Sequence, residues 1–159
     1  MLLGFVVLTL TARTVSADAG MNLERWLNAA GTQLLAVDFY ASHCEPCKKA
    51  MPRWKELQEK YGDRGFRLVV VSVADAQYGC ISLPGGVIPE YQVCDDEGVI
   101  HERFVPGGQL PRAFLWSWQG ELLVNTHDVA EIETGIQRYL RTSPRVVVAG
   151  ETADDEEDV

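Results

Sequence analysis

Two cysteines spaced as Cys-x-x-Cys at the start of a helical pattern constrain this chain more than any other feature. Cys44 and Cys47 follow an apolar run, Leu34–Tyr40, and Pro46 between them is tolerated in the first turn of a helix. Unpaired backbone N–H groups and the positive end of the helix dipole gather at such a start and lower the pKa of a thiol below its usual ~8.5. The second thiol, one turn further on, can attack a mixed disulfide, so the segment suits thiol–disulfide exchange.

The same spacing also occurs in zinc sites, but these need further ligands. A structural zinc site usually takes four ligands, often from a second Cys-x-x-Cys or a histidine pair at set spacing. The other two cysteines, Cys80 and Cys94, lie far apart in the sequence, and His43, His101 and His127 are scattered. We therefore favour redox chemistry over a metal site and expect neither a metal nor another cofactor, with the disulfide of the motif as the redox group.

Length and charge narrow the class of protein further. The 159 residues fit one domain with a core of its own, so the cysteines are not needed as staples. The net charge is −9, and six of the acids lie in 151–159, which holds no base. An acidic chain without a basic patch does not suit nucleic acid. We expect a monomer with one domain over 20–143 and an acidic, disordered tail over 144–159.

The first residues resemble a secretory signal peptide. The segment 1–10 is apolar apart from Gly4 and Thr9, is too short to span a membrane, and is followed up to Ala19 by small residues typical of a cleavage site. The basic start of such a peptide is missing. We expect 1–19 to be a signal peptide that exports the chain, to the periplasm in a bacterium, without a permanent membrane span. A poorly inserted anchor and a cytoplasmic location are the alternatives.

Apolar periodicity along the rest of the chain predicts alternating helices and strands. Helices are expected over 21–30, 46–61, 99–104 and 129–140, and strands over 34–40, 66–73, 91–94, 112–118 and 121–124. The segment 75–90 is expected to be a loop, and Phe114, Trp116 and Trp118 are expected to form a core stripe on one strand. Two buried strands joined by a helical crossover run parallel, and the last two strands form a hairpin. The predicted fold class is α/β, with a central mixed β-sheet.

The segment VDFYASHCEPCKKAMPRW strongly resembles the active-site segment of thioredoxin-like proteins, and the likeness extends over about 23–140. Four features carry it: the Cys-x-x-Cys at a strand–helix junction, Asp38 six residues before it, Pro52 five residues after it, where it should kink the helix, and Leu110-Pro111 before the hairpin strand. The run CEPCKK resembles the exported thiol–disulfide reductases that serve cytochrome c maturation. The resemblance implies a thioredoxin-like fold, with helices on both faces of the mixed sheet.

The resemblance also implies a role for each matching residue. Cys44 is the more exposed nucleophile, Cys47 is the buried resolving thiol, and Asp38 is a buried acid, with a pKa raised by burial, that exchanges a proton with Cys47. Pro111 is expected in the cis form beside the sulfurs, where Leu110 pairs with an extended substrate backbone. The implied enzyme is a protein-disulfide reductase that forms mixed disulfides with protein thiol or disulfide substrates and draws electrons from an upstream thiol–disulfide donor.

Several positions near the cysteines depart from the family pattern. His43 stands where many relatives have tryptophan, and an imidazole there favours the Cys44 thiolate, whereas the charge of Glu45 opposes it. His43, Glu45 and Pro46 are thus the residues expected to tune the site. Ala50 replaces an acid that the cytochrome-maturation reductases often carry. The sequence therefore leaves the reduction potential, the direction of exchange and the substrate open.

Two further questions have alternatives at this level. Cys80 and Cys94 have no counterpart in the family pattern: they form a second disulfide, which an oxidising compartment permits, or they stay free, with Cys94 as a buried apolar thiol. The function has two rivals, a redox-inert module that holds an extended peptide near Pro111, and a thiol peroxidase. The intact Cys-x-x-Cys argues against the first, and the absence from the sequence of a threonine-and-proline loop before a single cysteine argues against the second.

Overall fold

The computed structural model describes residues 23–73, 80, 82–95 and 97–143. The helices are α1 (Leu23–Leu27), α2 (Glu45–Tyr61), α3 (Val99–Phe104) and α4 (Val129–Thr142), with short 3₁₀ segments η1 (Gly62–Arg64) and η2 (Pro84–Gly86). The strands are β1 (Leu34–Tyr40), β2 (Phe66–Val73), β3 (Tyr91–Asp95), β4 (Arg112–Ser117) and β5 (Leu122–Thr126). The expected signal peptide over 1–19 and the expected tail over 144–159 lie outside the described residues.

The five strands form one mixed sheet in the order β3-β2-β1-β4-β5. β1 and β2 run parallel, as do β2 and β3, whereas β4 is antiparallel to both β1 and β5. The predicted crossover and the predicted hairpin are both confirmed. β1 lies in the centre of the sheet, and all seven of its residues are buried. The segment that leads into the Cys-x-x-Cys is therefore the most enclosed strand of the domain.

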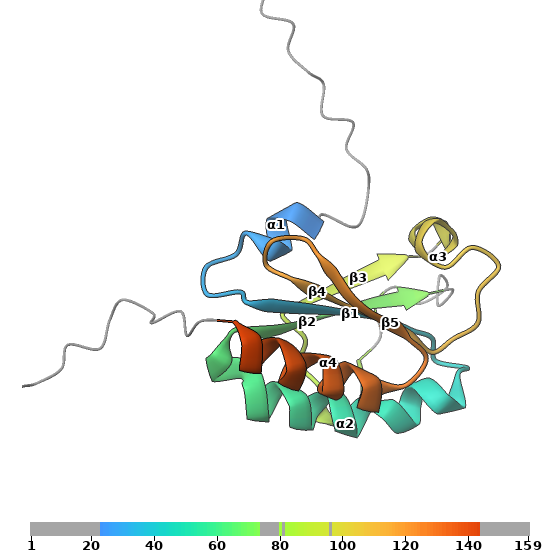
Figure 1. Ribbon diagram of the computed structural model, residues 1–159. Helices are drawn as coiled ribbons and strands as arrows, with labels where there is room; N and C mark the ends of the chain where they lie inside the picture. Colours follow the sequence, from blue (N-terminus) through green and yellow to red (C-terminus); the bar gives the residue numbers. More distant parts are fainter. Residues whose placement is uncertain (1–22, 74–79, 81, 96, 144–159) are drawn as a thin grey trace, which may run out of the picture.

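Helices cover both faces of the sheet, with α2 and α4 on one side and α1 and α3 on the other (Figure 1). Alternate residues of β1 point into the two layers, because successive side chains of a strand face opposite ways. Leu34, Ala36 and Tyr40 pack in the layer that contains α2 and α4, and Val37 and Phe39 pack in the layer that contains α1 and α3. Among the described residues, no helix has the length and apolar character that a membrane crossing requires.

One prediction about the core is wrong at its last residue. Phe114 and Trp116 are buried side by side, with ring centroids 5.2 Å apart, but Trp118 is 46% exposed. β4 ends at Ser117, and the chain turns there through a hydrogen bond from Gly120 N–H to the Ser117 carbonyl. Trp118 therefore lies in the turn of the hairpin, beyond the strand whose alternation would have buried it.

Candidate active site

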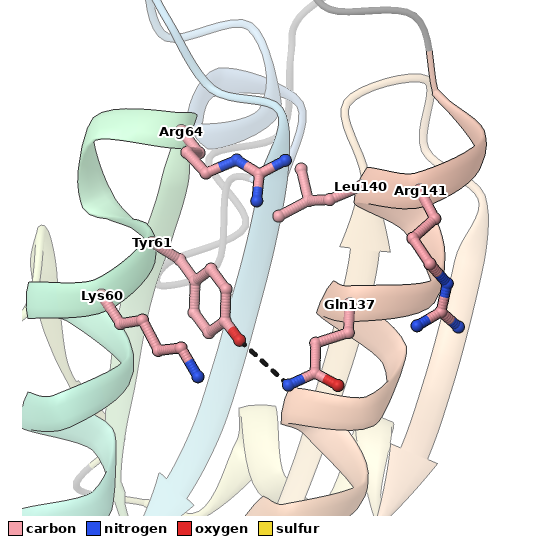
Figure 2. A pocket seen from close by; sticks show the side chains of 6 residues that line it. All are labelled: Lys60, Tyr61, Arg64, Gln137, Leu140 and Arg141. Carbon is pink, nitrogen blue, oxygen red and sulfur yellow. Dashed lines mark hydrogen bonds between the residues drawn. The ribbon is translucent and has the colours of Figure 1, made fainter.

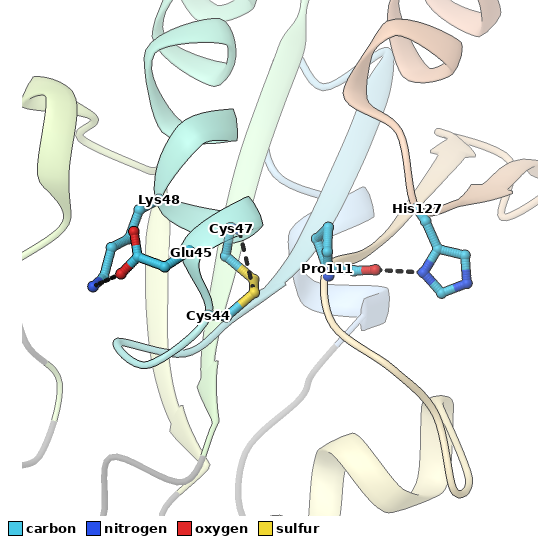
Figure 3. The surroundings of a disulfide bond; sticks show 6 residues. All are labelled: Cys44, Glu45, Cys47, Lys48, Pro111 and His127. Atoms are coloured by element: carbon cyan, nitrogen blue, oxygen red, sulfur yellow. Dashed lines mark hydrogen bonds and ion pairs between the residues drawn. A yellow bond between two sulfur atoms is a disulfide. The ribbon is translucent and has the colours of Figure 1, made fainter.

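The two cysteines of the motif form a disulfide at the start of α2, directly after the turn that follows β1 (Figure 3). The sulfurs are 2.08 Å apart and the Cα atoms 5.3 Å apart. Cys44 is the N-cap residue of α2, and its sulfur accepts a hydrogen bond from the Cys47 N–H at 3.2 Å. Cys44 is 8% exposed and Cys47 is 0% exposed. The first cysteine is thus the more exposed of the two, and it lies where a helix favours a negative charge, whereas its role as the nucleophile stays a prediction.

Asp38 lies in β1 on the side of the sheet that α2 covers, and it is 2% exposed. The strand register places Val70 of β2 and Ala113 of β4 beside it, so its neighbours across the sheet are apolar. Burial raises the pKa of Asp38 well above its ordinary value, and the nearby Trp54 indole lowers it only in part. A carboxyl group in this environment holds its proton to a higher pH than a surface aspartate does, and proton exchange between Asp38 and Cys47 stays a prediction.

The Leu110–Pro111 peptide bond is cis, as the resemblance implied. β4 runs antiparallel to β1, with Arg112 opposite Phe39, so Pro111 lies at the same edge of the sheet as the disulfide (Figure 3). Leu110 is half-buried and packs against the core on both sides of the sheet. The structure therefore brings the proline turn to the end of the sheet at which the sulfurs lie, and the role of this turn in holding substrate stays a prediction.

His127 contributes to the same edge, although the sequence analysis gave it no role. Its Nδ1 is 2.6 Å from the Pro111 carbonyl oxygen (Figure 3). A carbonyl oxygen only accepts hydrogen bonds, so Nδ1 carries the proton in this contact. β5 is antiparallel to β4 and therefore parallel to β1, which brings the residue directly after β5 to the edge where β1 ends. The predicted hairpin would have placed the residues after its second strand at this end of the sheet, but it would not have singled out His127 or its contact.

Glu45 between the two cysteines is paired with a lysine one turn later. Lys48 Nζ lies 2.6 Å from a Glu45 carboxylate oxygen on the exposed face of α2. The hydrogen bond from Lys48 lowers the pKa of Glu45, and the same bond raises the pKa of Lys48. Lys48 thus places a positive charge beside Glu45, and the expected effect of Glu45 on the Cys44 thiolate stays a prediction. His43 is exposed in the turn before α2, and its tuning role stays a prediction.

The remaining two cysteines also form a disulfide, with their Cα atoms 5.1 Å apart. Cys94 lies in the edge strand β3 and is exposed, so the alternative that it is a buried apolar thiol is wrong. The strand register pairs Cys94 with Ser72 of β2, and Ser72 with Tyr40 at the end of β1. Paired residues face the same side of a sheet, and Tyr40 faces α2. The second disulfide therefore lies on the α2 side of the sheet, two strands from the first.

We expect the Cys80→Ser/Cys94→Ser variant to be less stable than the wild type by about 2–3 kcal/mol, because the bond closes a short loop in the unfolded chain. The two cysteines are 14 positions apart in the sequence. Urea unfolding of the variant and the wild type, both without reductant, measures the difference. An unchanged free energy of unfolding would show that the bond does not constrain the unfolded chain. With added reductant, which opens Cys44–Cys47 in both proteins, the wild type and the variant should be equally stable.

No three histidine, cysteine or acidic side chains gather as a possible metal site within the described ranges. The comparisons with known proteins agree with the geometry. The model of the thioredoxin family matches residues 16–105, more than half of the chain. Chloroplastic thioredoxin F2 of Arabidopsis thaliana is 31% identical over 107 residues, which is 63% of this chain and 57% of that protein. Thioredoxin of Gallus gallus is 43% identical over 56 residues, 35% of this chain and 51% of that protein. The chain thus spans about half the length of these curated relatives.

Solved structures show the same architecture. The thiol:disulfide interchange protein DsbE of Chlorobium tepidum is 26% identical, with a TM-score of 0.53 over 70% of this chain and 80% of that chain. StoA of Bacillus subtilis is 20% identical, with a TM-score of 0.51 over 65% of this chain and 82% of that chain, and this likeness concerns the fold alone.

Proposed function

The chain belongs to the thioredoxin family, and we propose that it is a thiol–disulfide oxidoreductase that acts on protein substrates through Cys44 and Cys47. The observation that carries the proposal is the disulfide at the start of α2, in which the N-capping sulfur is the accessible one and the second sulfur is enclosed. The buried Asp38 on the same side of the sheet adds a group suited to proton exchange. A two-step exchange reaction needs a sulfur that reaches the substrate, a second sulfur that releases it, and a group that exchanges a proton, and these three features supply them.

In the reducing direction, the Cys44 thiolate attacks one sulfur of a substrate disulfide, and the other substrate sulfur leaves as a thiolate. Cys47 then loses its proton to the Asp38 carboxylate and attacks the Cys44 sulfur, which expels the second substrate thiolate. Two electrons have passed from the protein dithiol to the substrate, and the Cys44–Cys47 disulfide has formed. An upstream dithiol reverses the same two steps and restores the reduced protein.

Reduction of substrates outside the cytoplasm is the form of this activity that we propose. The resemblance to exported reductases of cytochrome c maturation supports it, and so does the exposed second disulfide, which persists in an oxidising compartment. Equilibration with glutathione buffers gives the reduction potential of the Cys44–Cys47 pair. A value near about −270 mV supports the reducing direction, and a value near about −120 mV would mark an oxidant instead.

Insulin reduction by dithiothreitol tests the activity itself. We expect the wild type to accelerate the reaction above the dithiothreitol background, and we expect both Cys44→Ser and Cys47→Ser to lose the acceleration. The Cys80→Ser/Cys94→Ser variant is the matched control and should keep it. Full acceleration by the Cys44→Ser variant would exclude the proposed reaction, and rapid peroxide consumption by the wild type would favour a thiol peroxidase.

We expect His127→Ala to raise the KM for insulin by about threefold to tenfold, with a smaller change in kcat. The lost hydrogen bond to the Pro111 carbonyl, worth ~1 kcal/mol, would leave the proline turn beside the sulfurs less firmly held. Steady-state rates over a range of insulin concentrations separate the two constants. His127→Asn retains a donor near the position of Nδ1 and should recover part of the loss. Equal constants in His127→Ala and the wild type would show that this contact does not position the turn.

A further inference from the structure

Asp38 shares its layer of the core with one other buried polar group that lacks a partner. Asp38 Oδ2 and Trp54 Nε1 are both enclosed, and neither forms a hydrogen bond of ordinary geometry within the described residues. Trp54 is 1% exposed. A buried donor or acceptor without a partner is costly, and native proteins leave few of them. A donor and an acceptor that are both unsatisfied in one apolar layer therefore call for a common explanation.

The helix geometry explains why these two groups meet. Trp54 follows Cys47 by seven residues, which is about two helical turns, so both side chains lie on the buried face of α2. That face covers the side of the sheet from which Asp38 projects, and all three residues lie in the layer between α2, α4 and the sheet. The indole is close enough to lower the pKa of Asp38, against the larger effect of burial.

The rest of the surroundings of Asp38 are apolar or already engaged. β2 and β4 bring Val70 and Ala113 to its sides, and α4 brings Ile132 and Ile136 into the same layer.

The titratable side chains buried in this layer with Asp38 are Tyr40, Tyr61, Cys44 and Cys47. Tyr61 lies near the far end of α2, where its hydroxyl bonds to Glu133 at 3.1 Å. The Tyr61 hydroxyl also accepts a hydrogen bond from Gln137 (Figure 2), and the donor that lowers the pKa of Asp38 is the Trp54 indole N–H.

We propose that Trp54 is a positioning residue for the exchange reaction, and that its indole N–H is held in place to receive the Asp38 carboxylate when Asp38 is ionised. The inference rests on the proposed function and names a residue that acts through Asp38. An ionised carboxylate accepts a strong hydrogen bond from the indole N–H, whereas a neutral carboxyl group accepts only a weaker one. Trp54 thereby sets how much of Asp38 is available as a base for the Cys47 thiol. An apolar side chain at position 54 would leave the carboxylate without this donor.

The test compares Trp54→Phe with Trp26→Phe, which removes a buried indole on the other face of the sheet. Carboxyl carbon NMR of the reduced protein follows the Asp38 titration directly. We expect Trp54→Phe to raise the midpoint by about one pH unit, the size of effect that a hydrogen bond to a charged group gives, and Trp26→Phe to leave it in place. The pH profile for decay of a preformed mixed disulfide should move upward by the same amount. An unmoved Asp38 midpoint in folded Trp54→Phe would overturn the proposal.

Two further measurements separate positioning from packing. In an Asp38→Asn background, Trp54→Phe should leave the pH profile unchanged, and a persisting shift would show that Trp54 does not act through Asp38. If Trp54→Phe fails to fold, the indole N–H resonance of Trp54 in the wild type should titrate with the Asp38 midpoint and should lose this titration in Asp38→Asn. A resonance that does not follow Asp38 would refute the assignment.

These titrations need no turnover, so they judge the role of Trp54 even if the chain fails to reduce insulin. Failure of the wild type to reduce insulin would reject the proposed function and leave the role of Trp54 to be judged by the titrations. A normal insulin assay together with an unmoved Asp38 midpoint in Trp54→Phe would reject the role of Trp54 and leave the proposed function standing.

Discussion

In the Cys47→Ser variant, we expect a disulfide-bonded protein substrate to accumulate covalently attached to Cys44. The accessible sulfur is still present and can attack, but the enclosed thiol that would release the substrate is gone. Well-oriented intramolecular groups act as if present at about 10⁵ M or more, so added thiol at ordinary concentrations does not replace Cys47. Mass spectrometry after acid quenching should therefore find the protein joined to insulin as the main product.

The Cys44→Ser variant is the sharpest control for this trap. Its remaining thiol at position 47 is 0% exposed, so we expect almost no adduct. Reductant used to prepare the samples also opens the exposed Cys80–Cys94 bond, and each variant is therefore compared in a Cys80→Ser/Cys94→Ser background as well. Equal trapping by Cys44→Ser and Cys47→Ser would contradict the assignment of the two roles.

The sequence predicted the elements that build the site because each carries a strong local signal. β1 and β2 are mainly apolar runs, interrupted by Asp38 in β1 and by Arg67 and Ser72 in β2, and their observed limits equal the predicted ones. The start of α2 is marked by Pro46 and by the cysteine that caps the helix. Local patterns of this kind do not depend on what the rest of the chain does, so they can be interpreted without a structure.

Features that depend on the tertiary fold were missed or left open. Trp118 continues an alternating pattern, but a turn that begins at Ser117 removes it from the strand. Whether Cys80 and Cys94 pair depends on the strand order, which brings β3 beside β2 at the edge of the sheet. The contact of His127 with Pro111 joins residues 16 positions apart, through the directions of β4 and β5. Sequence spacing alone contains none of this information.

Asp38→Asn should make the protein more stable at neutral pH while slowing its reaction. Burial raises the pKa of Asp38 in the folded state above the ~3.9 of an unfolded chain. A raised acid pKa contributes stability that is fully present below the unfolded pKa and is lost as the pH rises through the folded pKa. Asparagine has no such loss, so the stability gain of the variant should grow as the pH rises from about 4, by about 1.4 kcal/mol for each unit of pKa shift.

Urea unfolding at a series of pH values measures this gain, which should level off above the folded pKa of Asp38. The same variant loses the group that accepts the Cys47 proton, so decay of the mixed disulfide at pH 7 should slow by about 10²-fold and lose its dependence on the Asp38 titration. Glu133 is the matched control, because its pKa is lowered, chiefly by its hydrogen bond with Lys60. The destabilisation caused by Glu133→Gln should be fully present above the unfolded pKa of about 4.3 and should disappear as the pH falls through the lower folded pKa. A constant difference in stability between Asp38→Asn and the wild type at all pH values would mean that Asp38 is not titrating in a buried environment. In that case the buried carboxyl group could not be the proton acceptor of the exchange reaction.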